Sequence, residues 1–523
     1  MNASLQADQI LLSLEELILP FRQDLEKQSC PFEFGQDLSK IFIEKITLDS
    51  RTSGPGSLFC AMKGIGQDGH DFIPDAISRG CSAILCERKP NSPLTLEGAT
   101  LEKFLPPIFI FPSLKEKIEA LTQRLFPLKT NLCLIGVTGT NGKTSVTHFI
   151  AQALTKLNLP CGIIGSLSGS LTTPDRFELG RQLSLLPETV AIEVSSHALD
   201  QNRLADLPIK IAVFTNLSHD HLDYHQTLEA YATAKSRLFK RPELNSAVIN
   251  IDDERANFFI EAFKSAHPNR SCLTYSLSQK TADIHLSHPP SLNNKHAFEL
   301  TIQTPLGRFN TTLALWGEFN ISNILAALGA LIQMGYSKES LQKTLPYLTP
   351  PKGRMERITL PNQSIVIIDY AHTPDAFEKV LATLKKYTHK KSLSLSKQLI
   401  CVFGCGGDRD RTKRPKMAAI AEKYASFIIV TGDNSRFENP EQIFQDIISG
   451  FSQELNQDSN KKLKKSNNYK IIPSRELAIK TALQLASSGD VILLAGKGHE
   501  TYLDIEGKKI PFDERDFLPS FRS

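Results

Sequence analysis

The feature that most constrains the fold is a glycine-rich turn that joins an apolar run to a helical pattern. Residues 132–137 are almost continuously apolar, and apolar residues then recur at helical spacing from Val146 to Leu157. The turn between them, residues 136–144, reads Gly-Val-Thr-Gly-Thr-Asn-Gly-Lys-Thr. In a strand–turn–helix unit, the backbone N–H groups of the turn and the helix dipole can hold phosphate groups. The segment therefore predicts the start of a nucleotide-binding α/β domain.

This turn departs from the usual phosphate-loop pattern, because Val137 occupies the position of the first glycine. The remainder still ends in Gly-Lys-Thr, and an ordinary turn is the alternative interpretation. We expect Lys143 to reach the β- and γ-phosphates of ATP, and Thr144 to hold Mg²⁺. The residues predicted to bind the nucleotide here are Gly139, Thr140, Asn141, Gly142, Lys143, Thr144 and Ser145.

The rest of the chain repeats the α/β pattern in three regions, and 523 residues suit about three domains. We predict a small N-terminal α/β domain over residues 1–130. A central P-loop-type ATPase domain with a mainly parallel sheet follows over residues 131–351, and a Rossmann-like C-terminal α/β domain over residues 352–523. The other apolar runs expected to form strands are residues 81–86, 107–111, 190–194, 211–214, 247–251, 365–368, 399–403, 427–430 and 491–494.

Composition restricts the possible partners. The 60 Lys and Arg residues against 56 Asp and Glu residues leave a charge of +4, which argues against nucleic-acid or membrane binding. The first residues are too acidic for a secretory signal, and no run approaches the roughly 18 apolar residues of a membrane span. The nine cysteines lack metal-binding spacing and suggest reduced thiols. We expect a cytoplasmic monomer with small-molecule substrates, and solvated loops at residues 386–397 and 454–468.

Polar residues near the end of the run at 190–194 are candidates for chemistry. Glu193 is expected to bind a metal ion near the phosphate loop, although a structural hydrogen-bonding role is the alternative. The sequence Ser195-Ser196-His197 suggests a hydrolase at first sight. However, neighbouring residues on a strand point to opposite faces, and the chain has no G-x-S-x-G motif.

Several further motifs, taken together, resemble the Mur ligase family of amide-bond-forming enzymes. Their order and spacing match over nearly the whole chain. Any single motif would be moderate evidence, but the set spans all three regions. The matching segments are residues 193–197, 214–225, 230–239, 317–323, 353–357, 369–375, 404–409 and 496–500.

The resemblance implies a nucleotide and metal site. It assigns Mg²⁺ to Glu193 and His221, and ATP contacts to Asn320, Arg354 and Asp369. Without the resemblance, the cluster of His219, His221 and His225 could suggest zinc, but cysteine partners and an H-E-x-x-H helix are missing. With Lys143 and Lys235, His221 completes the expected catalytic set.

Lys235 falls on a helix predicted to begin near Thr227, where an exposed lysine with ordinary ion pairs is the alternative interpretation. In the family the matching lysine is carbamylated. Reaction with CO₂ would turn a cation into an anionic oxygen ligand, which suits a second Mg²⁺. We therefore expect a carbamate on Lys235.

The resemblance also assigns substrate contacts. Ser50 is expected to grip the UDP end of UDP-N-acetylmuramoyl-L-alanyl-D-glutamate. The residues expected to hold its muramoyl dipeptide are Thr172, Thr173, Ser195, Gln201 and Arg203. Their hydroxyl and guanidinium groups suit a sugar and a carboxylate.

The amino-acid substrate is expected to be meso-diaminopimelate, because residues 433–436 resemble the Asp-Asn-Pro-Arg motif of family members that add it. A guanidinium is the natural receptor for the distal carboxylate that lysine lacks. Ser435 replaces the proline, which frees a backbone N–H and relaxes the turn but leaves the charge of Arg436. The expected contacts are Arg409, Asp433, Asn434, Ser435, Arg436, Gly496 and Glu500.

The implied reaction is ATP-dependent ligation of this amino acid to D-Glu through an acyl phosphate, in peptidoglycan precursor synthesis. Two alternatives stay open. A folylpolyglutamate-synthetase-like ligase would share the phosphate loop but not residues 433–436 or the N-terminal region. A nucleotide-dependent switch would bind ATP without making an amide bond.

Overall fold

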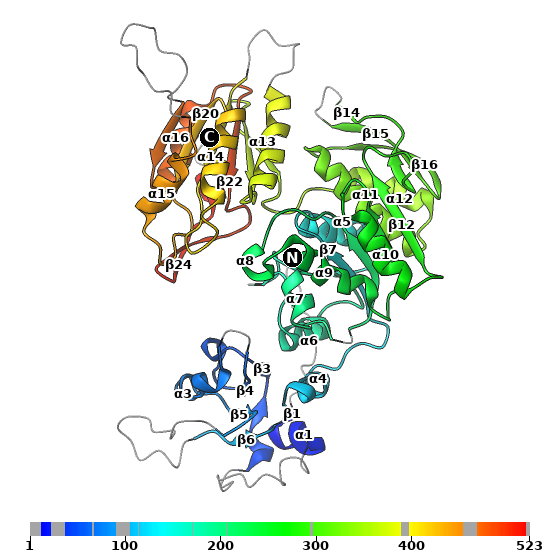
Figure 1. The fold of residues 1–523 in the computed structure, drawn as a ribbon, viewed down its shortest axis with the longest axis vertical. Coiled ribbons are helices and arrows are strands. Elements are labelled where there is room, and N and C mark those ends of the chain that lie inside the picture. Colours follow the sequence, from blue (N-terminus) through cyan, green and yellow to red (C-terminus); the bar gives the residue numbers. More distant parts are fainter. Residues whose placement is uncertain are drawn as a thin grey trace. The chain divides into compact units, whose positions relative to one another are not determined.

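The computed structural model describes residues 12–21, 37–64, 67–89, 105–112, 114–169, 171–205, 207–292, 297–388, 397–452 and 468–518. The chain divides into two compact units. The first comprises residues 1–134 and 160–209, and the second comprises residues 135–159 and 210–523. Figure 1 shows the elements along the chain. The predicted loops at residues 386–397 and 454–468 lie largely outside the described residues.

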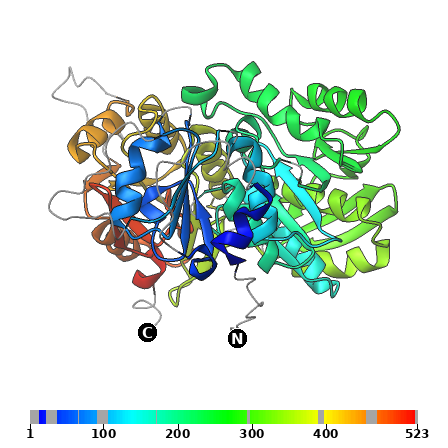
Figure 2. The same cartoon turned by 90° about the horizontal axis from the view of Figure 1, so that it is seen from below.

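The first unit contains a small parallel sheet in the order β3-β4-β5-β6. Along β4, Leu58 and Cys60 pack in one apolar cluster with helices α1 and α4, while Phe59 and Ala61 pack in another with α3. The alternation buries both faces of the sheet, as expected for parallel strands, and Figure 2 shows these strands in blue with helices beside them. The elements are β3 (Lys45–Thr47), β4 (Ser57–Ala61), β5 (Ala83–Cys86), β6 (Ile108–Ile110), α1 (Leu14–Ile18), α3 (Ile73–Ser78) and α4 (Leu114–Leu125), with the short antiparallel pair β1 (Leu12–Ser13) and β2 (Phe42–Ile43).

Residues 160–209 belong to the same unit. Strands β8 and β9 pair in parallel there. The buried Arg176 at the start of α6 donates from Nε to Glu119 of α4 at 2.7 Å, which ties this segment to the N-terminal part of the unit. The elements are β8 (Cys161–Ile164), α6 (Arg176–Leu185), β9 (Thr189–Glu193) and α7 (Ser196–Asp200).

The second unit begins inside β7 (Cys133–Thr138). Its first sheet runs in the order β14-β15-β13-β12-β11-β10-β7, and β16 pairs with β15. Neighbouring strands from β10 to β13 are parallel, whereas β14, β15 and β16 are antiparallel. The elements are α5 (Lys143–Lys156), β10 (Ile209–Phe214), α8 (Leu222–His225), α9 (Leu228–Ser236), β11 (Ser246–Asn250), α10 (Ala256–Ala266), β12 (Ser271–Ser276), β13 (Ile284–Leu286), β14 (Ser291–Leu292), β15 (Phe298–Thr304), β16 (Gly307–Leu313), α11 (Glu318–Gln333) and α12 (Lys338–Thr344).

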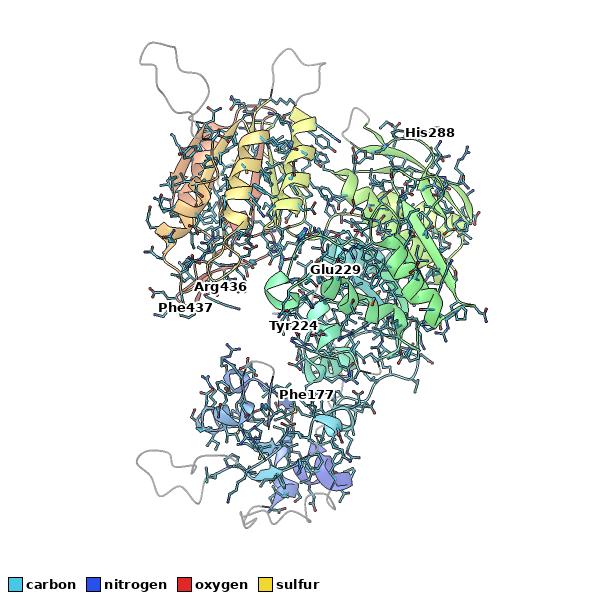
Figure 3. The ribbon with its side chains drawn as sticks, viewed as in Figure 1. Phe177, Tyr224, Glu229, His288, Arg436 and Phe437 are labelled. Carbon is cyan, nitrogen blue, oxygen red and sulfur yellow. The ribbon has the colours of Figure 1, made fainter. Side chains whose placement is uncertain are left out.

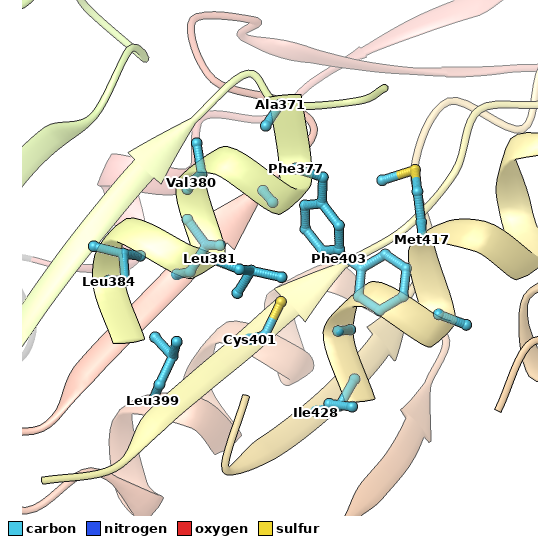
Figure 4. Close-up of a cluster of buried hydrophobic side chains, with 14 of the residues drawn as sticks. Ala371, Phe377, Val380, Leu381, Leu384, Leu399, Cys401, Phe403, Met417 and Ile428 are labelled. Carbon is cyan, nitrogen blue, oxygen red and sulfur yellow. The ribbon is translucent and has the colours of Figure 1, made fainter. Parts of the chain in front are cut away.

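The C-terminal part of this unit is a second sheet in the order β17-β18-β22-β19-β20-β21, in which only β17 is antiparallel to its neighbour. Along β19, Leu399, Cys401 and Phe403 pack under helices α13–α15, while Ile400 and Val402 pack under α16. Figure 4 shows the three residues of the first set with side chains of α13 and with Met417 of α14. The elements are β17 (Glu356–Thr359), β18 (Ile365–Asp369), α13 (Pro374–Thr388), β19 (Leu399–Phe403), α14 (Lys413–Tyr424), β20 (Phe427–Thr431), α15 (Pro440–Ile448), β21 (Tyr469–Ile472), α16 (Arg475–Leu485), β22 (Val491–Ala495), β23 (Tyr502–Ile505) and β24 (Lys508–Pro511).

The structure confirms the predicted α/β class and every strand predicted from an apolar run, with ends that shift by a residue or two. One placement is wrong. Ser196 and His197 lie in helix α7, not on a strand, because the Ser195 side chain accepts a hydrogen bond from the Ala198 N–H and starts a helix. The antiparallel strands β14–β16 were not predicted. Among the described helices, none is long and apolar enough to cross a membrane.

Candidate active site

The phosphate loop needs glycine at two positions. Gly139 has φ +150° and Gly142 has φ +87°, a region that other residues rarely adopt. A side chain at Gly139 would overlap the Thr215 hydroxyl, and one at Gly142 would lie 2.5 Å from the Asn323 side chain. Gly142 is also the N-cap of α5, so the loop presents the N-terminus of a 14-residue helix. This is the geometry of a phosphate-binding turn.

The loop is fastened to the end of strand β10. The Asn141 N–H donates to the Asn216 side chain at 2.9 Å, and the Thr215 hydroxyl donates to the Asn141 carbonyl at 2.6 Å. The Thr140 N–H donates to the Asn216 carbonyl at 2.8 Å, and the Thr140 hydroxyl accepts from the Ser218 N–H at 2.9 Å. These bonds fix the path of the loop before any ligand binds.

Lys143 and Thr144 stand at the start of α5. Lys143 Nζ donates to the carbonyls of Gly139 at 2.9 Å and Thr140 at 2.8 Å, so its ammonium lies over the loop. The buried Thr144 hydroxyl accepts from a guanidinium nitrogen of Arg354 at 3.3 Å. A cation and a hydroxyl beside the same turn suit a polyphosphate with its metal ion.

Lys235 lies on α9, whose N-cap is Thr227, so the predicted start of this helix is confirmed. The side chain is buried rather than exposed, at 1% relative exposure. Its Nζ donates to the Gly139 carbonyl at 2.9 Å and lies 4.4 Å from the centre of the Tyr231 ring. Burial lowers the pKa of Lys235 well below its ordinary value, and nearby Lys143 lowers it further. The site therefore favours the neutral amine.

The histidines near β10 do not gather into a metal centre in the described part of the chain, where no three His, Cys, Asp or Glu side chains do so. His221 has φ +54°, an uncommon conformation outside glycine, and its ring is half exposed. Its Nε2 lies 3.5 Å from the Asp220 carboxylate. His225 is buried against Tyr231, whereas His219 is exposed.

In the first unit, Glu193 ends β9 and is 1% exposed. Its Oε1 accepts a hydrogen bond from the Ser166 N–H at 2.9 Å. A side chain at Gly165 would overlap this carboxylate, so glycine is required for the close approach. A buried carboxylate with one strong donor retains acceptor capacity for a cation.

The residues predicted to hold the dipeptide form one hydrogen-bonded group in the first unit. The Thr173 hydroxyl donates to the Glu193 carbonyl at 2.7 Å and accepts from the Ser195 N–H at 2.9 Å. Arg203 donates to the Thr173 carbonyl at 2.8 Å and to the Gln201 side chain at 2.9 Å. Thr172 contacts the Ser166 hydroxyl at 3.0 Å.

Ser50 lies elsewhere in that unit. It is buried in a short 3₁₀ turn that Asp49 caps. A hydrogen bond from Ser50 holds the pKa of the Asp75 carboxyl below its ordinary value.

In the second unit, Asn320 and Asp369 are both buried. Asn320 donates to the Trp316 carbonyl at 2.8 Å. Asp369 accepts from the backbone N–H groups of Met355 at 2.7 Å and Ala371 at 2.8 Å. Burial raises the pKa of Asp369, and the nearby Arg354 guanidinium opposes that rise. Asp369 therefore fixes the segment that carries Arg354, whose guanidinium also reaches Thr144.

Three loops predicted to bind the amino acid follow neighbouring parallel strands. Residues 404–409 follow β19, residues 433–436 follow β20 and residues 496–500 follow β22. Because β22, β19 and β20 are adjacent, their carboxyl ends meet at one edge, where ligands bind in such sheets.

The loops interlock closely. Arg436 has φ +51° and donates to the Gly407 carbonyl at 2.7 Å, and its guanidinium lies 3.9 Å from Asp504. A side chain at Gly407 would overlap the Ser435 carbonyl, and one at Gly496 would lie 2.8 Å from the Asp433 carboxylate. Figure 3 labels Arg436 beside the exposed Phe437. The structure thus brings residues 433–436 and Gly496 together.

Glu500 joins the same cluster, because its Oε2 accepts from the Asn434 side chain at 2.9 Å. Arg409 is exposed, and its guanidinium donates to the Asp408 carbonyl at 2.9 Å. The loop that carries Arg409 is nevertheless tied to the cluster, since the Phe437 N–H donates to the Asp408 carboxylate at 3.0 Å.

Sequence reasoning missed one member of this cluster. Lys497 is fully buried and contacts both Asn434 and Glu500 at 2.8 Å. It lies inside the Gly496–Glu500 motif, but a lysine between two glycines gives no sign in the sequence that it is buried.

Comparison with known proteins identifies the family of this chain. Three domain models match in order: the Mur ligase family catalytic domain at residues 42–117, the Mur ligase middle domain at 137–331, and the glutamate ligase domain of Mur ligases at 353–498. Two curated relatives are named UDP-N-acetylmuramoyl-L-alanyl-D-glutamate–2,6-diaminopimelate ligase. The protein from Ectopseudomonas mendocina is 42% identical, with 91% of this chain and 94% of the relative covered. The protein from Pseudomonas aeruginosa is 41% identical, with 92% and 95% covered.

A solved structure of a ligase with the same name is 33% identical and covers 98% of both chains, with a TM-score of 0.59. The MurF ligase of Thermotoga maritima in complex with ADP, 18% identical, covers 86% of this chain and 93% of its own, with a TM-score of 0.58, and shares the fold. The phosphate loop, the buried lysine beside it and the three loops at the C-terminal sheet edge thus occur in a chain that, by these similarities, belongs to the Mur ligase family and has its three-domain α/β architecture.

Proposed function

We propose that this chain joins meso-diaminopimelate to the D-Glu residue of UDP-N-acetylmuramoyl-L-alanyl-D-glutamate, with cleavage of ATP to ADP and phosphate, in peptidoglycan precursor synthesis. The observation that carries the substrate assignment is the cluster at the C-terminal sheet edge. There the partly exposed guanidinium of Arg436 and the carboxylate of Glu500 belong to one set of interlocked loops. Paired charges of opposite sign suit an amino acid with a distal carboxylate and an ammonium group. The names of the relatives give 2,6-diaminopimelate as the amino acid.

Residues 139–145 are the proposed ATP site, with Asn320, Arg354 and Asp369 as further contacts. Lys143 would neutralise charge on the β- and γ-phosphates, and Thr144 would offer its hydroxyl to a metal ion. The oxygen donors present, a threonine hydroxyl and the buried carboxylate of Glu193, fit the hard cation Mg²⁺. Together with His221 these residues would hold the ion, which would supply charge neutralisation at the transferring phosphoryl group.

We propose a carbamate on Lys235. Carbamylation needs a neutral amine, and burial lowers the pKa of this side chain. Its Nζ already lies 2.9 Å from the Gly139 carbonyl of the phosphate loop, so an added carboxylate would be held beside that loop. The modified side chain would then complete the metal ligands as an oxygen donor.

The reaction follows in two steps. A side-chain carboxylate oxygen of D-Glu attacks the γ-phosphorus of ATP, and the bond between this phosphorus and the bridging oxygen breaks. The products of this step are ADP and the acyl phosphate of D-Glu. The neutral amine of diaminopimelate then attacks the acyl carbon, phosphate leaves with the bonding electrons, and the nitrogen loses a proton to solvent. The chain contributes position and charge, so no side-chain nucleophile is required.

The remaining assignments complete the proposal. Residues 1–130 would bind the UDP end through Ser50, residues 131–351 would bind ATP and the dipeptide, and residues 352–523 would bind the amino acid. The dipeptide contacts would be Thr172, Thr173, Ser195, Gln201 and Arg203, and the amino-acid contacts would include Arg409 and Ser435. The monomeric state and the cytoplasmic location stay predictions.

The test is identification of the products by mass spectrometry. Purified chain with Mg-ATP, UDP-N-acetylmuramoyl-L-alanyl-D-glutamate and meso-diaminopimelate should form the tripeptide product, with one ADP for each amide bond. Hydroxylamine in place of the amino acid should trap the acyl phosphate as a hydroxamate. A nucleotide-dependent switch would give neither product, and a ligase for a different acceptor would leave the UDP substrate unchanged.

A further inference from the structure

We propose that Lys497 is a positioning residue of the amino-acid pocket, which orients Asn434 and Glu500 so that one oxygen of Glu500 is left for a substrate ammonium. This inference rests on the proposed function. It adds to that function a role for Lys497, which is fully buried and therefore cannot contact the substrate directly.

The three side chains form a closed hydrogen-bonded triangle. Lys497 Nζ donates to the Asn434 side-chain oxygen at 2.8 Å and to Glu500 Oε2 at 2.8 Å. Asn434 closes the triangle by donating its amide nitrogen to the same Glu500 oxygen at 2.9 Å. Each side chain is therefore held by the other two.

The triangle decides which way the Asn434 amide points. Its oxygen accepts from Lys497 Nζ and also from the Asp504 N–H at 2.9 Å, so the amide nitrogen must face Glu500. Without the ammonium of Lys497, the amide could turn over and present its oxygen to the carboxylate, which is repulsive. Lys497, together with the Asp504 N–H, thus fixes the orientation of two predicted substrate contacts.

The two carboxylate oxygens of Glu500 differ in their hydrogen bonds. Oε2 of Glu500 takes both internal donors. Oε1 takes no hydrogen bond from the described part of the chain and is the oxygen available to a substrate ammonium. A carboxylate held at one oxygen and open at the other is preorganised, because binding need not order its side chain.

Burial makes the position of Lys497 depend on these partners. Its side chain is 0% exposed, and its Nζ also lies 3.8 Å from the Asp433 carboxylate and 5.3 Å from the centre of the Tyr502 ring. A buried ammonium is costly unless it is paired and hydrogen-bonded. Three of its partners, Asp433, Asn434 and Glu500, are residues expected to contact the amino acid. The contacts of Lys497 therefore lie with the proposed substrate-binding residues, which is the reason to assign it a positioning role.

The test is a double-mutant cycle of Lys497→Met and Glu500→Gln, with the KM for meso-diaminopimelate measured at saturating Mg-ATP and UDP substrate. Methionine keeps the length of the chain without the charge. We expect Lys497→Met to raise this KM at least about tenfold, as for loss of a charged hydrogen bond, and to leave the KM for ATP within about twofold. If Lys497 acts through Glu500, the double variant should bind no worse than Glu500→Gln alone.

The matched control is Lys480→Met, which removes an exposed lysine from helix α16 of the same domain and should change neither KM. If Lys497→Met melts below the assay temperature, Asn434→Leu opens the same triangle from another corner. It should show the same rise and the same coupling to Glu500→Gln.

The outcomes separate the two proposals. Additive effects of the two substitutions, or equal rises in the KM for ATP and diaminopimelate, would overturn the role of Lys497 while the ligase activity stands. A wild-type chain without diaminopimelate-dependent turnover would overturn the proposed function, and this inference with it.

Discussion

The phosphate loop and the amino-acid loops are both built at the ends of buried strands, but different forces hold them. The phosphate loop is one continuous segment, and its contacts to residues 215–218 involve backbone groups and neutral side chains. The proposed amino-acid site combines three loops that lie far apart in the sequence. Buried charged side chains such as Lys497 and Arg475 connect them. The proposed nucleotide site is therefore held mainly by neutral hydrogen bonds, and the proposed amino-acid site by a network of buried ions.

This difference has a physical consequence. Hydrogen bonds among backbone groups and neutral side chains, and glycine conformations, depend less on any single partner, because the loss of one leaves no uncompensated charge. Buried ions depend on each partner, because removal of one leaves an uncompensated charge. Substitutions in the amino-acid site should therefore alter binding or stability at a distance, whereas those beside the phosphate loop should act on catalysis directly.

The largest effect is expected at Lys235, which belongs to the phosphate-loop side of the comparison. Lys235→Ala removes the proposed carbamate, and we expect kcat to fall by about 10³-fold, as when a group that stabilises developing charge is lost. Phosphate release is the measurement, and added formate should restore part of the activity. Lys240→Ala, at a nearby exposed lysine, is the control. Full activity of Lys235→Ala without added anions would contradict the carbamate.

The next effect concerns the stability of the C-terminal domain. Arg475 is buried, pairs with Glu514 at 2.8 Å and donates to the Ala495 carbonyl at 2.7 Å, just before the loop of Gly496. Arg475→Met leaves Glu514 charged and buried. We expect the free energy of unfolding to fall by about 3–5 kcal/mol, measured by thermal or urea unfolding.

A second substitution sharpens this test. Arg475→Met combined with Glu514→Leu removes both charges and should recover most of the lost stability, because an apolar pair can replace a buried ion pair. If the double variant is no more stable than Arg475→Met, the ions do not hold this part of the domain as described.

A smaller effect is expected at Arg436. Arg436→Ala should raise the KM for meso-diaminopimelate by about 30- to 150-fold, the cost of roughly 2–3 kcal/mol for a charged hydrogen-bonded contact. The KM for ATP should stay unchanged. Arg436→Lys should not restore binding fully, because an ammonium lacks the forked donors of a guanidinium. Equal loss of affinity for both substrates would show that the substitution only disturbs the loop.

The smallest effect is a dependence of stability on pH. The pKa of Lys235 is lowered in the folded chain, so between that value and about 10.4 the unfolded chain binds more protons. The free energy of unfolding should therefore rise with pH in this window, by at most about 1.4 kcal/mol per pH unit. In CO₂-free buffer, the melting temperature of the wild type relative to that of Lys235→Met should therefore rise as the pH is raised through this window. A constant difference across pH would refute the shift.

The same contrast explains what could be predicted from the sequence. The strand and helix around residues 136–144 follow from apolar spacing, and the loop lies inside one segment, so both could be placed in advance. Residues 433–436 and 496–500 were assigned through the resemblance, and the structure brings them together at one sheet edge.

The burial of Lys235 and Lys497 could not be predicted from spacing. Both lysines are covered by elements that are distant in sequence, as the contact of Lys235 with the Gly139 carbonyl illustrates. The short helix at Ser196 was missed because one capping hydrogen bond from Ser195, rather than apolar periodicity, begins it. Sequence patterns therefore do not predict features that depend on tertiary packing or on a single side-chain cap.

The most direct test of the central claim is phosphate release by the purified chain with Mg-ATP and UDP-N-acetylmuramoyl-L-alanyl-D-glutamate, in parallel with meso-diaminopimelate, with L-lysine and without an amino acid. We predict turnover with meso-diaminopimelate alone. Turnover with lysine would agree with a ligase but contradict the proposal that Arg436 selects the amino acid by binding its distal carboxylate. Phosphate release that is the same in all three reactions would contradict the proposed ligase.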